Sequence, residues 1–413
     1  KPKFYEAMNN LGITLSEKGE LDSAIRCYAD AITIDRERPE LYYNIGNAFS
    51  EKKDLQAALD NYKLALEINP EYPAPYFNIG NIFLKSGYLQ RALENYECAL
   101  ELDPNEVSYF NMLDYIELQI LGPSLHQRPR HLHRNVSQHI LINDKKHQIL
   151  QAIYFFLAGD FKSSEEYLQK FDDLENSSSG SYFDRQDQIF CQVYRRFITE
   201  LLLKKPPHME VKNTCVYHLG ESHSLSYAHS CIDIMNKSYT VCPKLIFGAK
   251  AYHFTNIEEK SYQSIAQHIL REIPKKSIVF ISFGEIDCRF DEGIISAFKK
   301  SDLILEHIIS KTVKEYVSWF FVENINNFHE YYFFNVPAPV FNMNETTSAS
   351  LKVAEVVKIF NDYLAESLTE LDGNIIDVYK HTVNAEGFSN GLFHCDKFHL
   401  DNRILPLISE QLS

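Results

Sequence analysis

The stretch YNIGNAFSEKKDLQAALDNYKLALEINP, residues 43–70, is the middle one of three related copies near the start of the chain. NNLGITLSEKGELDSAIRCYADAITID precedes it at residues 9–35, and FNIGNIFLKSGYLQRALENYECALELDP follows at residues 77–104. Small residues at fixed points let the two helices of one copy approach closely, a tyrosine fills the space between them, and stacking of the copies completes the core. The sequence therefore predicts an all-helical solenoid. Four sets of residues repeat at intervals of 34: Gly12, Gly46 and Gly80; Ala24, Ala58 and Ala92; Tyr28, Tyr62 and Tyr96; Ala31, Ala65 and Ala99.

This pattern resembles the tetratricopeptide repeat (TPR). By this resemblance three full copies occupy residues 5–106, a capping helix follows at 107–120, and LAGDFKSSEEYLQKF at 157–171 is a degenerate fourth unit. We expect the TPR repeats and their cap over residues 1–122. A helical linker that contains the degenerate TPR-like unit is expected over residues 123–210.

An asparagine also recurs in the repeats, at Asn10, Asn44 and Asn78, two residues before each glycine. A side-chain amide offers a donor and an acceptor together, which suits the N–H and C=O groups of an extended peptide. The set resembles the asparagine ladder of O-GlcNAc-transferase repeats, which implies a protein or extended peptide as partner on the inner face of the solenoid. The alternative is that these amides are solvated or stabilise neighbouring turns.

Composition and charge limit the classes of function. With 413 residues, of which 45% are apolar, the chain is long enough for two or three domains. The formal net charge of −15 argues against a nucleic-acid partner, which needs a surplus of lysine and arginine on one face. No run of about 18 apolar residues is present to span a membrane, and the cysteines include no Cys-x-x-Cys pair. We expect a cytoplasmic protein with no membrane span.

Beyond about residue 210 short apolar or aromatic runs alternate with longer segments of helical periodicity. This alternation predicts a parallel sheet covered on both faces, a three-layer α/β/α domain over residues 211–413. Chemistry in such sheets gathers at the carboxyl ends of the strands. The expected strands are residues 215–219, 241–247, 277–283, 331–336 and 374–379, and the expected helices are 223–236, 258–271, 300–328 and 350–371. The overall fold class is thus α + α/β, with an N-terminal α-solenoid.

Three residues of this second part have the types needed for nucleophilic catalysis. Ser222 follows the first expected strand, and Asp396 precedes His399 by three residues near the end of the chain. A serine hydroxyl needs an imidazole to take its proton, and the imidazole needs a carboxylate to fix its tautomer. The spacing of three lets Asp396 and His399 share one face of a turn.

Four short blocks resemble those of the SGNH, or GDSL-type, hydrolase superfamily over residues 213–413. Gly220-Glu221-Ser222 is similar to the Gly-Asp-Ser block, with glutamate for aspartate. The resemblance implies that Ser222 is the nucleophile and that its N–H and that of Gly248 donate to the oxyanion. Asp396 and His399 match the closing Asp-x-x-His block as orienter and general base.

The third block departs from the family. Gly284-Glu285-Ile286-Asp287 aligns with Gly-x-Asn-Asp, so that Ile286 replaces the asparagine that donates to the oxyanion. Loss of one such donor costs on the order of 3 kcal/mol, about a hundredfold in rate, unless another group replaces it. Arg289 is a candidate replacement. Glu285 and Asp287 either hold that arginine, or Glu285 faces the substrate.

Each of these residues also has a plainer interpretation. Gly-x-Ser after a strand is common because serine caps helices and glycine forms turns. We expect His218 to be an interior residue of a strand, and His223 to lie on a helix or loop surface, because adjacent helical residues do not face each other. A zinc site formed by His218, His223 and His229 is disfavoured, because their spacings of five and six match no one-face helical pair.

The predicted function is ester chemistry on a hydroxyl-bearing substrate such as a glycan. The protein would be a serine-dependent acyl-ester hydrolase or O-acyltransferase, with acetyl as a plausible group and with no metal or cofactor required. Its TPR repeats would recruit a protein or peptide. The first alternative is a catalytically weak or inactive SGNH-like binding or scaffold protein, which Ile286 favours. The second is a TPR-linked glycosyltransferase, for which residues 211–413 are short.

Overall fold

A computed structural model describes residues 2–121, 144–177, 185–204, 214–255, 260–290, 293–341 and 347–413. The described residues fall into two compact units, one reaching Ile116 and the other beginning at Glu117. Much of the expected linker, residues 123–210, therefore belongs to the same unit as the sheet, while its residues 123–143, 178–184 and 205–210 lie outside the described part. None of the described helices combines the length and the hydropathy needed to cross a bilayer.

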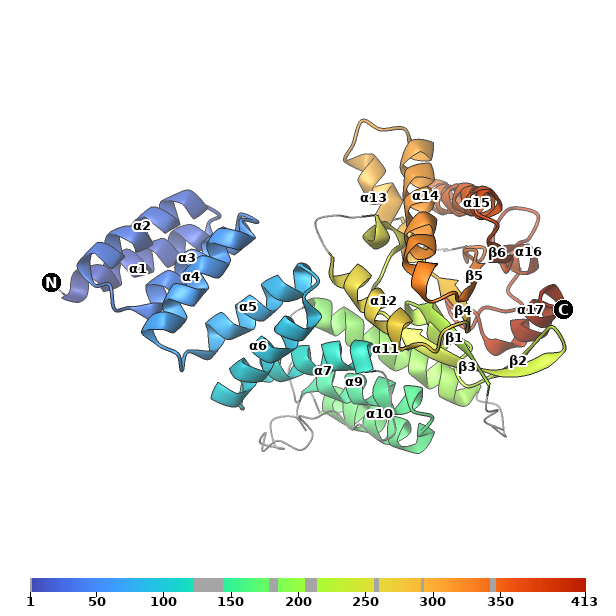
Figure 1. Cartoon of the computed structure of the whole chain (residues 1–413), viewed down its shortest axis with the longest axis horizontal. Coiled ribbons are helices and arrows are strands. Elements are labelled where there is room, and N and C mark those ends of the chain that lie inside the picture. The colour runs from blue at the N-terminus through green and yellow to red at the C-terminus, as the bar shows by residue number, and fades with distance from the viewer. Residues whose placement is uncertain are drawn as a thin grey trace. The chain divides into compact units, whose positions relative to one another are not determined.

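The first unit is built from antiparallel helix pairs (Figure 1). The glycine of each repeat faces the tyrosine of the second helix, and a Cβ added at Gly46 would lie 2.5 Å from a ring carbon of Tyr62. Tyr62 itself is 1% exposed. The repeat pattern thus works as expected, since only a residue without a side chain lets the ring enter. The helices are α1 (Pro2–Glu17), α2 (Leu21–Ile34), α3 (Pro39–Glu51), α4 (Leu55–Ile68), α5 (Pro73–Lys85), α6 (Leu89–Leu102) and α7 (Val107–Leu121), the last of which continues into the second unit.

Of the residues that the structure describes between α7 and the first strand, three helices belong to the second unit: α9 (Lys145–Leu157), α10 (Phe161–Asn176) and α11 (Arg185–Leu203). Asp144 caps α9 by accepting from the amide of His147, and Asp160 caps α10 by accepting from the amide of Ser163. The segment expected to form a degenerate repeat, residues 157–171, is the turn between α9 and α10 with most of α10. Most side chains of α9 are buried, which indicates that this helix is a core element.

The sheet of the second unit is mixed, in contrast to the all-parallel sheet that the sequence predicts. Its order is β2-β3-β1-β4-β5-β6, and β2 runs antiparallel to β3 while all other neighbours are parallel. The five expected strands are present and only β2 was missed. The strands are β1 (Cys215–Gly220), β2 (Cys231–Ile234), β3 (Lys237–Leu245), β4 (Ile278–Ser282), β5 (Glu330–Phe334) and β6 (Asn374–Ile376).

The helix predicted over residues 223–236 is wrong. A short 3₁₀ turn at Ser222–Leu225 is followed by β2, which forms a hairpin with β3. Met235 and Asn236 both have positive φ, 47° and 60°, as a two-residue turn of this kind requires. Ile232 and Ile234 are buried while their neighbours in the strand are exposed. Burial in this stretch therefore alternates with a period of two, as in a strand, and does not follow the helical spacing that the sequence suggests.

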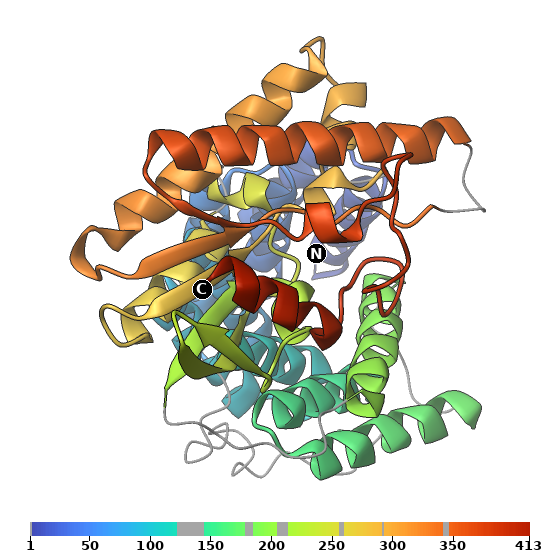
Figure 2. The same cartoon turned by 90° about the vertical axis from the view of Figure 1, so that its right-hand side faces the viewer.

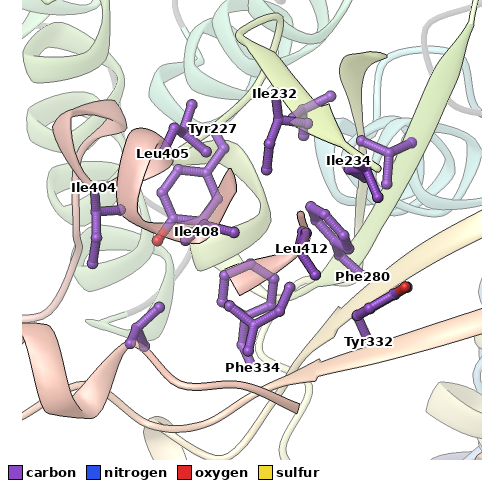
Figure 3. Packing of buried hydrophobic residues seen from close by; sticks show 14 of the residues in the cluster. Tyr227, Ile232, Ile234, Phe280, Tyr332, Phe334, Ile404, Leu405, Ile408 and Leu412 are labelled. Carbon is purple, nitrogen blue, oxygen red and sulfur yellow. The ribbon is translucent and has the colours of Figure 1, made fainter. Parts of the chain in front are cut away.

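Helices cover both faces of this sheet. On one face Phe333 of β5 packs against Tyr316 and Phe320 of α14, with ring centroids 5.7 and 5.8 Å apart. On the other face Phe334 packs in a cluster with Ile408 and other residues of α17 (Figure 3). Figure 2 shows the long orange-red helix α15 above the strands. The remaining helices are α12 (Ser261–Glu272), α13 (Gly293–Lys299), α14 (Leu305–Glu323), α15 (Thr347–Glu370), α16 (Tyr379–Thr382) and α17 (Leu405–Gln411).

Candidate active site

The ends of three parallel strands meet where β1 finishes at Gly220. A Cβ at this position would lie 2.3 Å from Oγ of Ser282, the last residue of β4, so glycine is required for the close approach. On the other side the amide of Ile246 donates to the carbonyl of Gly220 over 2.8 Å, which extends the pairing with β3. Ser222 begins the 3₁₀ turn immediately afterwards. The hydroxyl is thereby fixed at the carboxyl edge of the sheet.

Residues 394–400, here called the closing segment, bring Asp396 and His399 to this serine. The Oδ1 atom of Asp396 accepts from the amides of Phe398 and His399, each over 2.7 Å, and Oδ2 lies 2.8 Å from Nδ1 of His399. The Nε2 atom of His399 lies 2.8 Å from Oγ of Ser222. Burial raises the pKa of a carboxyl, but these hydrogen bonds outweigh it and hold the pKa of Asp396 well below its usual range. Asp396 is therefore an ionised acceptor that orients the imidazole.

Phe197 of α11 completes the setting of His399, and nothing in the sequence marks it. Its ring is stacked on the imidazole, with centroids 3.8 Å apart and planes inclined by 19°. Ser222 is 6% exposed and His399 is 2% exposed, so the pair is almost fully withdrawn from water. Phe197 lies in the segment that the sequence assigns to a linker. That segment has no motif from which the role of Phe197 could be predicted.

His223 lies in the short turn after β1, and it is buried, unlike the helix-surface position that the sequence offers as one alternative. Its Nδ1 contacts Oε1 of Glu221, and its Nε2 lies 2.9 Å from the carbonyl oxygen of Phe398. The other carboxylate oxygen of Glu221 contacts Oγ of Ser222. Burial lowers the pKa of an imidazole, but the facing Glu221 carboxylate outweighs it and raises the pKa of His223 to about 9. The rule that adjacent residues of a helix do not face each other does not apply here, because the chain turns at Ser222.

The two glycines proposed for the site lie in loops that follow neighbouring strands. Gly248 is exposed, with φ of 65°, three residues after β3 ends. Gly284 follows β4 with φ of 120°, and a Cβ there would lie 2.6 Å from the ring of Phe360. Both loops leave the sheet at the same carboxyl edge as Ser222, because β1, β3 and β4 are parallel.

Glu285 and Arg289 form an ion pair in the loop after β4. The Nε atom of Arg289 donates to both carboxylate oxygens of Glu285, over 3.1 and 3.0 Å, and the shortest contact of the pair is 2.6 Å. The guanidinium also lies over the ring of Phe398, 4.2 Å from its centroid. Glu285 thus holds the arginine, and it also lines the cavity described below, so both positions that the sequence leaves open for it are compatible with the structure.

Asp287 takes no part in that ion pair. It is completely buried, and its carboxylate accepts from the amides of Ala251 and Tyr252 over 2.7 and 3.2 Å. Burial raises the pKa of Asp287 to about 6, against the lowering effect of these two bonds. The residue thus ties the loop after β3 to the loop after β4, rather than contacting Arg289 as the sequence suggests. Ile286 beside it is 8% exposed.

A cavity of about 210 Å³ adjoins the closing segment. Its walls come from the loop after β4, the segment that follows β5, helix α15 and the residue that precedes His399. Most of the lining side chains are apolar, and the charged ones stand on the loop after β4 and on the closing segment. The lining residues include Glu285, Arg289, Val353, Val357 and Phe398, together with residues 336–340.

One group of described residues has a spacing that suits a metal ion. The ligand atoms of Glu221, His223 and His399 lie within 4.8 Å of one another. Each of these residues is in hydrogen-bond contact with another member of the group or with Ser222, so we interpret the group as an acid–base network rather than a metal site. The trio of His218, His223 and His229 is not brought together: His218 bonds to Ser282 inside the sheet, as an interior residue.

In the first unit two of the three recurrent asparagines bond to the preceding repeat. The Nδ2 atom of Asn44 donates to Oδ1 of Asn9, and that of Asn78 donates to Oδ1 of Asn47, each over 2.9 Å. Asn10 is exposed. The side-chain amides at these two positions therefore make contacts between neighbouring repeats.

Comparisons with known proteins identify the first unit. A family model described as TPR repeat matches residues 12–53 and 46–87, and one described as Tetratricopeptide repeat matches residues 74–106. No curated protein matches the chain. Among solved structures, the first TPR of Spaghetti (RPAP3) bound to the HSP90 peptide SRMEEVD is 27% identical, with 28% of this chain and 93% of that chain covered and a TM-score of 0.27.

Two further solved structures are similar to part of this chain. The Yersinia enterocolitica type III secretion chaperone SycD in complex with a peptide of the translocator YopD is 18% identical, covering 27% of this chain and 92% of that chain with a TM-score of 0.26. A MamA RS-1 double mutant is 18% identical, covering 42% of this chain and 96% of that chain with a TM-score of 0.34. The N-terminal region of this chain, residues 12–106, consists of tetratricopeptide repeats.

Proposed function

We propose that the second unit is a serine-dependent acyl-ester hydrolase or O-acyltransferase with an SGNH-like three-layer fold, acting on a hydroxyl-bearing substrate such as a glycan. The observation that carries the proposal is the chain of two 2.8 Å contacts from Asp396 through His399 to Ser222. A hydroxyl, an imidazole and an ionised carboxylate in this order have the geometry of general-base activation.

The reaction follows from these contacts. Oγ of Ser222 attacks the ester carbonyl carbon while its proton passes to Nε2 of His399, and Asp396 stabilises the imidazolium that forms. When the tetrahedral intermediate collapses, the leaving alkoxide takes that proton and an acyl-serine remains. Water or an acceptor hydroxyl then attacks the acyl carbon and gives its proton to Nε2 of His399, and His399 returns that proton to Oγ of Ser222 as the C–O bond to the serine breaks. The proposed donors to the oxyanion are the amides of Ser222 and Gly248.

The substrate is proposed to occupy the cavity beside the closing segment. Phe398, the residue before His399, and His394 of the same segment line this cavity. Apolar walls from residues 336–340 and Val353 suit an acyl or hydrocarbon part, and Arg289 offers a charge for a polar part. The TPR repeats are proposed to bind a protein or extended peptide and so raise the local concentration of substrate.

A fluorophosphonate probe tests the proposal, because it reacts covalently with activated serines. We expect one adduct on the full chain that is absent in Ser222→Ala and present at the wild-type rate in Ser226→Ala, a buried serine of the same loop. A folded wild-type protein that stays unlabelled would favour the second candidate, a binding or scaffold protein. Ile286 is the observation behind that candidate, since an apolar side chain stands where the family has an oxyanion donor.

A further inference from the structure

Two carboxylate–imidazole pairs meet at the hydroxyl of Ser222. On one side Asp396 orients His399, whose Nε2 lies 2.8 Å from Oγ. On the other side Glu221 contacts Oγ through Oε2 and His223 through Oε1. All the contacts are within hydrogen-bond reach, so Ser222 stands in the middle of a continuous chain of hydrogen bonds. Only the first pair is used in the mechanism proposed above.

The two ends of this chain are fixed. Asp396 already accepts two amides and is an ionised acceptor, so Nδ1 of His399 carries a proton. The carbonyl oxygen of Phe398 can only accept, so Nε2 of His223 carries a proton as well. Three contacts remain between these ends: His399 with Ser222, Ser222 with Glu221, and Glu221 with His223. Each of them needs one proton to be a hydrogen bond rather than a repulsion between lone pairs.

Ser222 has one proton and two acceptors. If it donates to His399, then Oε2 of an ionised Glu221 faces Oγ with no proton between them. If it donates to Glu221, the contact with His399 needs a proton on Nε2, and an imidazolium cannot serve as base. The contacts in the structure are all satisfied only in a form of the site that holds one proton more than the reactive form.

The surroundings favour an ionised Glu221. His223 faces it directly, and the other titratable groups around the two imidazoles are Asp396 and His394 on the closing segment, Glu285 with its partner Arg289 on the loop after β4, and His218 on β1. Burial raises the pKa of a carboxyl, but the His223 cation outweighs it and lowers the pKa of Glu221. Both residues are buried, so bulk water does not replace either partner.

Resting on the function proposed above, we propose that Glu221 is a catalytic residue that competes with His399 for the hydroxyl proton of Ser222, and that His223 is the positioning residue that holds Glu221 in place. Loss of one proton from the network switches the hydroxyl from Glu221 to His399 and makes it reactive. During attack that hydroxyl proton passes to Nε2 of His399, and Glu221 keeps its charge throughout.

The test is the rate of fluorophosphonate labelling of the full chain as a function of pH. In Glu221→Gln the amide can donate to Oγ, so the hydroxyl donates to His399 without an extra proton. We expect the acid limb of the profile to move to lower pH by roughly one unit. Asp401→Asn is the matched control, because it removes a buried carboxylate that pairs with Arg403 and not with Ser222. Its acid limb should stay within about 0.3 of a unit of the wild type.

A second measurement observes the wild-type protein, and a variant serves only to assign its signals. Nitrogen-15 NMR of the histidine rings, with His223→Gln for assignment, should show both ring nitrogens of His223 protonated at pH 7.5. A uniformly slower Glu221→Gln with an unshifted profile, or an unprotonated Nδ1 in His223, overturns the inference. Absence of any labelling in folded wild type overturns the proposed function instead, and the NMR result then decides the proton arrangement by itself.

Discussion

Phe197 lies flat against His399, with ring centroids 3.8 Å apart, and it reaches the site from a helix that ends before the first strand of the sheet begins. The imidazole is thus held on one side by Asp396 and on its face by an aromatic ring. Stacking of this kind is worth about 0.5–1.5 kcal/mol beyond the area buried. The geometry of the base therefore depends on α11 as well as on the closing segment.

We predict that Phe197→Leu lowers kcat on an activated ester by about 3–10-fold with little change in KM, because the base loses a restraint while the cavity is untouched. Phe171→Leu is the matched control, since it removes another buried ring from the neighbouring helix α10. Equal kcat in the two variants would show that the Phe197 ring contributes only bulk.

The ion pair of Glu221 and His223 predicts a dependence of stability on pH. The pKa of His223 is raised, so the stability it contributes is fully present below its unfolded value of about 6.5 and is lost as pH rises through about 9. We expect the Tm of the wild type to fall between these values more steeply than that of His223→Gln, measured by thermal unfolding in buffers of matched ionic strength. Parallel Tm curves would contradict the pairing.

In the first unit, Asn78→Ala should lower the free energy of unfolding of the repeats by about 1 kcal/mol. Its amide donates to Asn47, which also accepts from the hydroxyl of Tyr62 over 2.8 Å, so one deletion disturbs a shared acceptor. Asn10→Ala is the control because that side chain is exposed. Thermal unfolding of the full chain measures both. An unchanged Tm together with lost peptide capture would restore the peptide-groove interpretation.

The cavity predicts where substrate binding can be blocked without touching the base. Val353 is half-buried in the cavity wall on α15, and Leu351 on the same helix is 53% exposed and outside the lining. We expect Val353→Trp to raise KM about tenfold with kcat nearly unchanged, and Leu351→Trp to leave both constants alone. Steady-state kinetics on one ester measures the pair, and identical behaviour of the two variants would place the substrate elsewhere.

Residue type and spacing were sufficient to predict the serine, the aspartate and the histidine that the structure brings together. The pairing of Glu221 with His223 was not predictable, because the sequence indicated a helix over 223–236, in which neighbours point apart. The chain instead makes one 3₁₀ turn and then a hairpin, so the two side chains meet. The contact of Phe197 with His399 could not be predicted for another reason, because a contact between elements far apart in the sequence leaves no local pattern.

Asp287 illustrates the same limit. The sequence left open that Asp287 helps to hold Arg289, but a fully buried carboxylate needs donors, and the amides of Ala251 and Tyr252 supply them. The order of the strands determines which loop comes near enough to supply these donors, and the sequence analysis gave no strand order. The repeats are the opposite case, since each glycine and its tyrosine lie sixteen residues apart and the period alone defines their contact.

The most direct measurement is mass spectrometry of the protein quenched during turnover of 4-nitrophenyl acetate. If Ser222 attacks with His399 as base, the peptide that contains residue 222 gains one acetyl group in the wild type, and Ser222→Ala shows no such gain. Release of nitrophenol without acetylation of Ser222, or acetylation that persists elsewhere in the alanine variant at the same rate, would contradict the account.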